Sequence, residues 1–194
     1  MRICAAEGSL GGTEDSFPIQ KTILAGVSTK LANHCEYRRN SLLIDSEVLT
    51  IFFEWVLRRH VHINDQETMV RAWQFGRKWE IPAFQNEVMR NLVAEFSDKT
   101  INLRAMRQAY GATSSKDAER DELLRKAFIT EFASESRDRT WVEEDLLESG
   151  LDKCIEFHRD YTRVMCIAYD YDDDYDPKAD GARIADLLVG ETIE

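Results

Sequence analysis

Apolar side chains recur at helical spacing along most of the chain and predict a series of helices from residue 21 onward. Residues 46–59 carry apolar side chains on more than one face, which predicts a helix packed by neighbours on several sides at the centre of the core. Residues 66–80 predict an amphipathic helix, and Pro82 opens the next one because proline disfavours helix at the residue before it. We therefore expect two helices that fold back on one another across a short turn.

The beginning of the chain has a different pattern. "RICAAE" (residues 2–7) and "SFPIQ" (residues 16–20) predict two short strands, and the glycine-rich stretch "GSLGGTED" joins them as a hairpin turn. "SLLID" (residues 41–45) predicts a third short strand, after which Asp45 and Ser46 can cap the central helix. The expected fold class is therefore α+β.

The net charge of −11 is concentrated at one end of the chain. Residues 1–139 carry 20 Lys+Arg and 20 Asp+Glu, whereas residues 140–194 carry 5 and 16, so the C-terminal segment holds the whole excess of acid. A neutral body with an acidic end lacks the positive surface that nucleic acid and anionic membranes attract. We expect neither as a partner.

The cysteines favour a reducing compartment. Cys4, Cys35, Cys154 and Cys166 are far apart in the sequence, which is typical of free thiols and not of a disulfide framework or a cysteine-zinc site. No apolar run approaches the length of a membrane span, and the opening residues are too short for a secretory signal. The expected location is intracellular, either cytoplasmic or nuclear.

The order of motifs in the first half of the chain resembles the BTB/POZ domain, in particular the short forms common in fungi. "FPIQKTIL" is followed by a serine, by the tryptophan-bearing stretch "LLIDSEVLTIFFEWVL" and by "WEIPAFQN". The most specific element is Ile-Pro-x-x-Gln-Asn after the tryptophan helix. The residues that match the family pattern are Phe17, Ile19, Lys21, Leu24, Ser28, Phe52, Trp55, Ile81, Pro82, Gln85 and Asn86.

The resemblance implies a BTB/POZ-like domain over residues 1–97, with a small sheet and a cluster of helices. A helical extension over residues 98–139 and an acidic, partly helical segment over residues 140–194 would follow it. Family members dimerise, and many adapt substrates to cullin-type ubiquitin ligases. The sequence departs from the pattern at Gln20, where the family has histidine, and at Leu57, where it has tyrosine; His34 and Cys35 also stand in a stretch that is usually apolar or aromatic. The upstream segment that some relatives exchange between partners is not part of this sequence, so we expect a dimer through the first helices.

Candidate catalytic and metal-binding side chains are few. Ser28, His34 and Cys35 are the near neighbours to weigh for nucleophilic catalysis, but no glycine-flanked nucleophile turn accompanies them. His60 and His62 would point the same way on a strand and could bind a metal, although no third ligand lies nearby and surface histidines at a helix end are more common. We expect no catalytic, cofactor-binding or metal-binding residues, and no cofactor.

Three further motifs favour ordinary structural roles. The acidic run from Asp170 fails as a calcium loop because Tyr175 stands where glycine is needed and Gly181 where glutamate is needed, which leaves a solvated linker with weak cation binding. "EGSLGGTED" lacks the lysine-serine or lysine-threonine ending of a phosphate-binding loop. The helical pair divided at Pro82 could read DNA, but its second helix has no excess of base over acid.

These observations favour a non-enzymatic protein-interaction module that self-associates and adapts a cullin-type ubiquitin ligase. Two alternatives stay open. One is an acidic regulatory protein that binds a basic partner through its C-terminal segment by electrostatic steering. The other is a small enzyme of unrecognised type that uses His34, Cys35 or the acidic segment. The apolar spacing in "ARIADLLVG" (residues 182–190) predicts a short terminal helix that docks on the body or on a partner.

Overall fold

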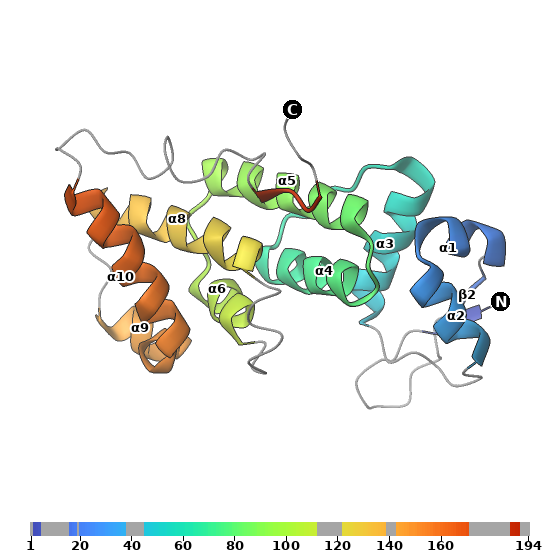
Figure 1. Cartoon of the computed structure of the whole chain (residues 1–194), viewed down its shortest axis with the longest axis horizontal. Coiled ribbons are helices and arrows are strands. Elements are labelled where there is room, and N and C mark those ends of the chain that lie inside the picture. Colours follow the sequence, from blue (N-terminus) through green and yellow to red (C-terminus); the bar gives the residue numbers. More distant parts are fainter. Residues whose placement is uncertain are drawn as a thin grey trace.

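Helices make up most of the described residues in the computed structural model of this chain (Figure 1). It describes residues 2–4, 16–18, 20–37, 45–111, 122–138, 143–170 and 187–190. Their helices are α1 (Lys21–Val27), α2 (Thr29–Tyr37), α3 (Ser46–Arg58), α4 (Gln66–Lys78), α5 (Pro82–Asp98), α6 (Leu103–Tyr110), α8 (Glu122–Asp138), α9 (Glu143–Ser149) and α10 (Ile155–Asp170), with a short 3-10 helix η1 (Leu151–Lys153) before α10.

The expected α+β class is wrong, because the fold is predominantly all-helical. Among the described residues, β structure is limited to the antiparallel pair β1 (Arg2–Cys4) and β2 (Ser16–Pro18), in which Ile3 lies opposite Phe17. Such a small pair cannot organise a core, since a stable sheet needs three or more strands with an apolar face. The expected third strand and the glycine-rich turn fall on residues 41–44 and 8–15, outside the described residues. The core is therefore built by helices packing on helices.

Local sequence signals mark three helix beginnings, of which those at Asp45 and Pro82 were predicted. The Asp45 carboxylate accepts a hydrogen bond from the Glu47 N–H at the start of α3, and Asp65 accepts one from the Thr68 N–H at the start of α4. Pro82 occupies the first turn of α5, where its missing N–H costs nothing. The prediction of two helices divided at Pro82 is confirmed.

We expect Asp65→Ala to lower the free energy of unfolding by about 1 kcal/mol, the usual loss for an N-cap. Burial by itself would raise the pKa of Asp65, but hydrogen bonds from Thr68 and the charge of Arg71 bring the pKa below its usual range. Because the folded carboxyl has the lower pKa, its stabilisation is present above about pH 4 and is lost as the pH falls through the folded pKa.

Urea titrations at pH 7 and at pH 3 measure both effects. Asp65→Asn is the matched control, because asparagine caps a helix about as well as aspartate but carries no charge. It should keep most of the stability at pH 7 and lose less of it at pH 3 than the unsubstituted chain does. Equal losses of stability between the two pH values in the chain and in Asp65→Asn would contradict the role of the charge.

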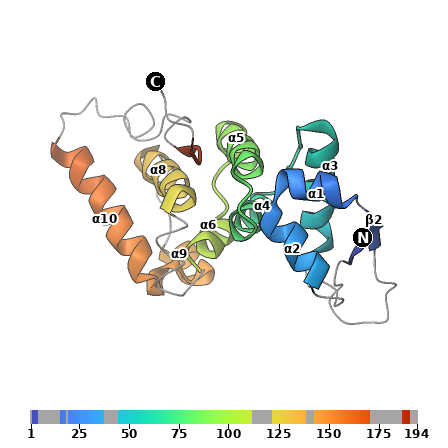
Figure 2. The ribbon, with the colours of Figure 1, turned by 45° about the vertical axis from the view of Figure 1, so that its right-hand side comes forward.

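The helices form an elongated array with α4 and α5 at its centre (Figures 1 and 2). Helices α1 and α2 lie at one end beside α3, whereas α9 and α10 lie at the other end beyond α6 and α8. One continuous cluster of buried side chains runs through the array, and the ring pair Phe96–Phe128, at 5.2 Å, joins α5 to α8. The predicted segments 1–97, 98–139 and 140–194 therefore share a core. None of the helices in the described ranges is both long and apolar enough to cross a membrane.

Candidate interaction surface

The turn between α4 and α5 is the best-defined local feature of the first half of the chain. The Ile81 N–H donates to the Gly76 carbonyl at 2.8 Å, and the Glu80 N–H donates to the Arg77 carbonyl at 3.1 Å. With Glu80 at φ 55°, these two bonds form the Schellman ending of a helix, in which the left-handed residue is usually glycine. The backbone therefore reverses within Trp79–Ile81, and Pro82 starts α5 immediately afterwards.

Close packing holds the two helices together just beyond the turn. A side chain carbon added at Gly76 would lie 2.7 Å from Cγ of Gln85 and 3.2 Å from Cδ1 of Phe84, so only glycine leaves room for them. The ring of Phe84 lies 5.3 Å from the ring of Trp55 and 5.6 Å from that of Phe52, both on α3. The Ile-Pro-x-x-Gln-Asn element thus places α5 against both α4 and the tryptophan-bearing central helix, as the position of Pro82 predicted.

Ser28 ties the first two helices to this turn. Its buried hydroxyl donates to the Trp79 carbonyl at 2.5 Å and accepts a hydrogen bond from the Leu31 N–H at 3.0 Å. On the surface, the Lys30 ammonium lies 2.6 Å from the Glu80 carboxylate, but both groups are exposed and such pairs contribute little stability. The junction of α1 and α2 is therefore held at the end of α4 mainly by the serine.

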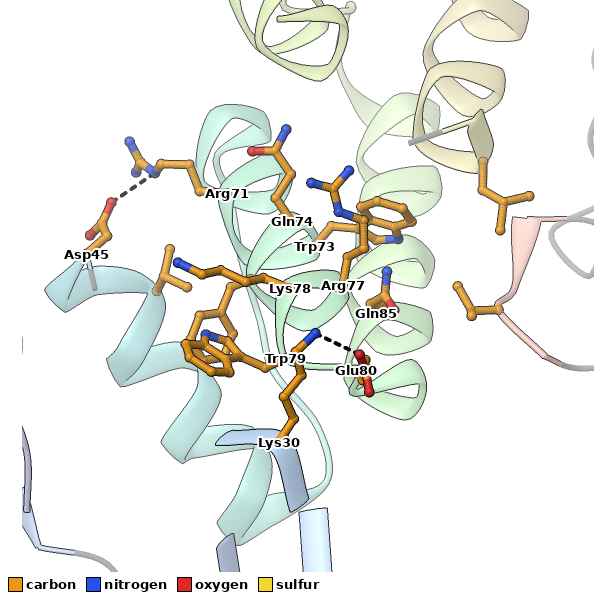
Figure 3. Close-up of a pocket in the computed structure, with 14 residues that line it drawn as sticks. Lys30, Asp45, Arg71, Trp73, Gln74, Arg77, Lys78, Trp79, Glu80 and Gln85 are labelled. Atoms are coloured by element: carbon orange, nitrogen blue, oxygen red, sulfur yellow. Dashed lines mark hydrogen bonds and ion pairs between the residues drawn. The ribbon is translucent and has the colours of Figure 1, made fainter. Parts of the chain in front are cut away.

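An open pocket of about 810 Å³ runs along α4 (Figure 3). Four cationic residues and two acidic ones line it, together with two tryptophans that are buried in the core. We call it the α4 pocket; its lining residues are Lys30, Asp45, Val48, Arg71, Trp73, Gln74, Phe75, Arg77, Lys78, Trp79, Glu80, Gln85, Leu123 and Val189.

Part of the positive charge of the α4 pocket is paired within the chain. Arg71 Nε lies 3.1 Å from Asp45 Oδ2, and the same guanidinium reaches Glu47 at 2.7 Å. Figure 3 shows the Arg71–Asp45 pair and, across the pocket, Lys30 reaching Glu80. The Lys78 ammonium lies 5.4 Å from the centre of the Trp79 ring, which is a cation–π distance. The pocket therefore combines cationic side chains, several of them paired, with the edges of two buried tryptophans.

The three residues considered for nucleophilic catalysis are surrounded by contacts that serve the packing of the helices. Ser28 is engaged with Trp79 and Leu31, and the His34 ring meets the Trp79 ring edge-on at 5.0 Å. Burial raises the pKa of the Cys35 thiol, which disfavours the reactive thiolate. Within residues 20–37, no hydrogen bond joins these three side chains to one another. The structure does not assemble them into a catalytic group.

The two histidines weighed as metal ligands lie in the extended segment after α3, where no strand forms. Both are exposed, and His60 Nδ1 lies 2.5 Å from Glu87 Oε1 on α5. The described part of the chain has no group of three or more histidine, cysteine, aspartate or glutamate side chains that could hold a metal ion. The acidic run considered as a calcium loop begins at Asp170, the last residue of α10, and its other residues, 171–181, lie outside the described ranges.

Two features of this surface were missed in the sequence. Arg71, Gln74 and Lys78 stand three and four residues apart, a spacing that places them on one face of a helix and could have revealed the cationic lining. Asn86, noted only as part of a motif, contacts Val189 more than a hundred positions away. No local pattern predicts that contact.

Comparisons with known proteins find no relative of this chain. No protein-family model matches it, and neither the curated proteins nor the solved structures include a match. The function therefore has to be inferred from the residues and contacts of this chain.

Proposed function

We propose that this chain is a non-enzymatic protein-interaction module of the BTB/POZ type that self-associates through its first helices. The observation that carries the proposal is the Ile81-Pro82 turn. In the described residues it packs α5 on the tryptophan-bearing α3, and Ser28 ties α1 and α2 to the same point. The motif residues are thus used to build a rigid unit, and none of their observed contacts requires a substrate.

The surface of α1 supports the proposed self-association. Leu24 is fully buried, whereas its neighbour Ile23 is 43% exposed. Helices α1 and α2 lie at the end of the helical array, where a second copy can approach (Figure 2). A symmetric dimer uses the same patch on both subunits, so an apolar side chain at this end would be buried twice, once in each copy. Burial of Ile23 would remove apolar surface from water.

Light scattering on the purified full chain tests self-association. We expect the mass of a dimer for the unsubstituted chain and the mass of a monomer for Ile23→Asp, because the substitution would bury an unpaired carboxylate on each side of the interface. Ile155→Asp is the matched control: Ile155 is 78% exposed on α10, at the other end of the array, and the dimer should persist. A monomeric unsubstituted chain, or a dimer that survives Ile23→Asp, would rule the proposal out.

We further propose that the module serves as an adaptor for a cullin-type ubiquitin ligase. Leu57 supports this step, because it is 81% exposed in the last turn of α3 and is thus free to enter an apolar pocket of a scaffold. Co-elution of the full chain with a purified cullin tests it. Leu57→Asp should abolish the co-elution and leave the dimer mass unchanged, whereas an unsubstituted chain that elutes apart from the cullin would contradict the adaptor role.

A further inference from the structure

Residues 187–190 lie between α5 and α8, far in sequence from the helices that they contact (Figures 1 and 2). The Val189 N–H donates to Asn86 Oδ1 at 2.6 Å, and Asn86 Nδ2 donates to the Val189 carbonyl at 3.2 Å. Leu187 is completely buried in the core cluster, and Leu188 and Val189 pack against it. Of the two predicted alternatives, docking on the body or on a partner, the described residues 187–190 show the first, although they form turns and not an α-helix; residues 182–186 lie outside the described ranges.

The two hydrogen bonds join the side-chain amide of Asn86 to both backbone groups of Val189. A side-chain amide carries one acceptor and one donor group, the same pair that a peptide unit offers in a sheet. The Asn86 amide therefore satisfies the N–H and the carbonyl of Val189 together, and the contact depends on the backbone and not on the Val189 side chain. The apolar anchor is supplied by Leu187. Backbone pairing combined with a side-chain anchor is a common way of binding short peptides.

The docked segment also borders the α4 pocket. Val189 and Leu123 line that pocket together with residues of α4, so the segment supplies part of its wall. Between α10 and the segment run residues 171–186, which include Asp172, Asp173, Asp174 and Asp176. A tethered segment rebinds as an intramolecular partner, which raises its effective concentration far above that of a free peptide. Few contacts are then enough to keep the site occupied.

We propose that the surface around Asn86 is a docking site for a short apolar peptide and that residues 187–190 occupy it in cis as a detachable latch, which closes one side of the α4 pocket. The site takes a leucine anchor followed by a turn of backbone. Release of the latch opens both the peptide site and the adjoining wall of the pocket. This inference concerns α5, α8 and the C-terminal segment, and it does not depend on self-association through α1.

Peptide binding to the full chain provides the first test. The probe is a fluorescent peptide with the sequence of residues 183–190, RIADLLVG. Leu187→Asp should release the latch, so we expect the peptide to bind this variant at least tenfold more tightly than it binds the unsubstituted chain. In the Leu187→Asp background, Asn86→Ala should weaken peptide binding roughly tenfold or more, because it leaves the peptide N–H and carbonyl without their partner.

Asn91→Ala in the same background is the matched control. Asn91 lies on the same helix and donates to the Glu87 carbonyl, but its observed hydrogen bonds do not include the segment. Peptide affinity should be unchanged. Equal peptide affinity for the unsubstituted chain and Leu187→Asp, absence of binding to Leu187→Asp, or an equal loss in both asparagine variants would overturn the proposal.

Amide hydrogen exchange gives a second readout that needs no added peptide. In the unsubstituted chain the Val189 amide should be protected, and Asn86→Ala should remove that protection while amides of α3 and α4 stay protected. Light scattering then distinguishes cis from trans occupancy. Equal masses for the unsubstituted chain and Leu187→Asp support a cis latch, whereas a lower mass for Leu187→Asp means that the segment binds a second copy and overturns the cis assignment.

Discussion

Phe84→Ala should lower the free energy of unfolding by about 3–5 kcal/mol, the range for removing a large aromatic side chain from a packed core. The Phe84 side chain is fully buried. Its ring lies 5.3 Å from that of Trp55, 5.6 Å from that of Phe52 and 6.3 Å from that of Phe75, so it joins α5 to α3 and α4 at once. Alanine would leave a cavity at the centre of this junction, because helices held on three sides cannot close it.

Urea unfolding followed by tryptophan fluorescence measures the loss. Phe84→Leu is the matched control: it keeps an apolar side chain in the site and should cost about 1–2 kcal/mol, clearly less than alanine. The position of Trp55 beside the site also means that its emission should shift to longer wavelength in the alanine variant. A loss below about 1 kcal/mol for Phe84→Ala would show that Phe84 is not the centre of the junction.

Asp160→Ala should cost a similar amount, about 3–5 kcal/mol, for an electrostatic reason. Arg125 on α8 is buried, with its side chain only 8% exposed, and Asp160 on α10 supplies a carboxylate 3.8 Å from its Nε. This distance exceeds that of a hydrogen bond, so the two groups attract one another as charges. The Tyr110 hydroxyl donates to the same carboxylate at 3.2 Å. Removal of the carboxylate would leave a buried guanidinium without its counter-charge.

The matched control for this prediction is Arg159→Ala. Nε of Arg159 also lies 3.7 Å from Oδ1 of Asp160, but the Arg159 side chain is 68% exposed. Exposed ion pairs contribute at most about 1 kcal/mol to stability. The double variant Arg125→Met with Asp160→Ala should recover part of the loss, because an apolar side chain replaces the unpaired charge. Thermal and urea unfolding of the unsubstituted chain, Asp160→Ala, Arg125→Met and the double variant complete a double-mutant cycle. Equal costs for Asp160→Ala and Arg159→Ala would refute the buried-pair explanation.

Tyr110 belongs to the same group and remains a hydrogen-bond donor throughout the neutral range. Burial, followed by the negative charge of Asp160, raises the pKa of its hydroxyl far above the usual value for tyrosine. The Arg125 guanidinium lies 5.6 Å from the centre of the Tyr110 ring and acts in the opposite direction. These side chains come from α6, α8 and α10. They form a polar centre in the second half of the array, beside the ring contacts among Phe132, Phe157 and Tyr161.

Local signals in the sequence were enough to locate most helices. The caps at Asp45 and Asp65, the break at Pro82 and the apolar stripe through Phe84 and Phe96 depend only on neighbouring residues. Such signals act within one helical turn, so they can be read without knowledge of the partner helix. The predicted fold class was wrong because three short strand-like stretches were interpreted as a small sheet. In the described residues only one pair of three-residue strands forms.

By itself, the sequence determined where several helices begin, which of their faces are apolar, and that the excess of acid lies in the last part of the chain. Only the tertiary structure decided which residues meet across long separations. It brought Ser28 to Trp79, Arg125 to Asp160 and Asn86 to Val189. The physical reason is that helical periodicity shows which face of a helix is buried but not which helix covers it. Apolar faces pack against one another with little specificity, so the partners are selected by the packing of the whole chain.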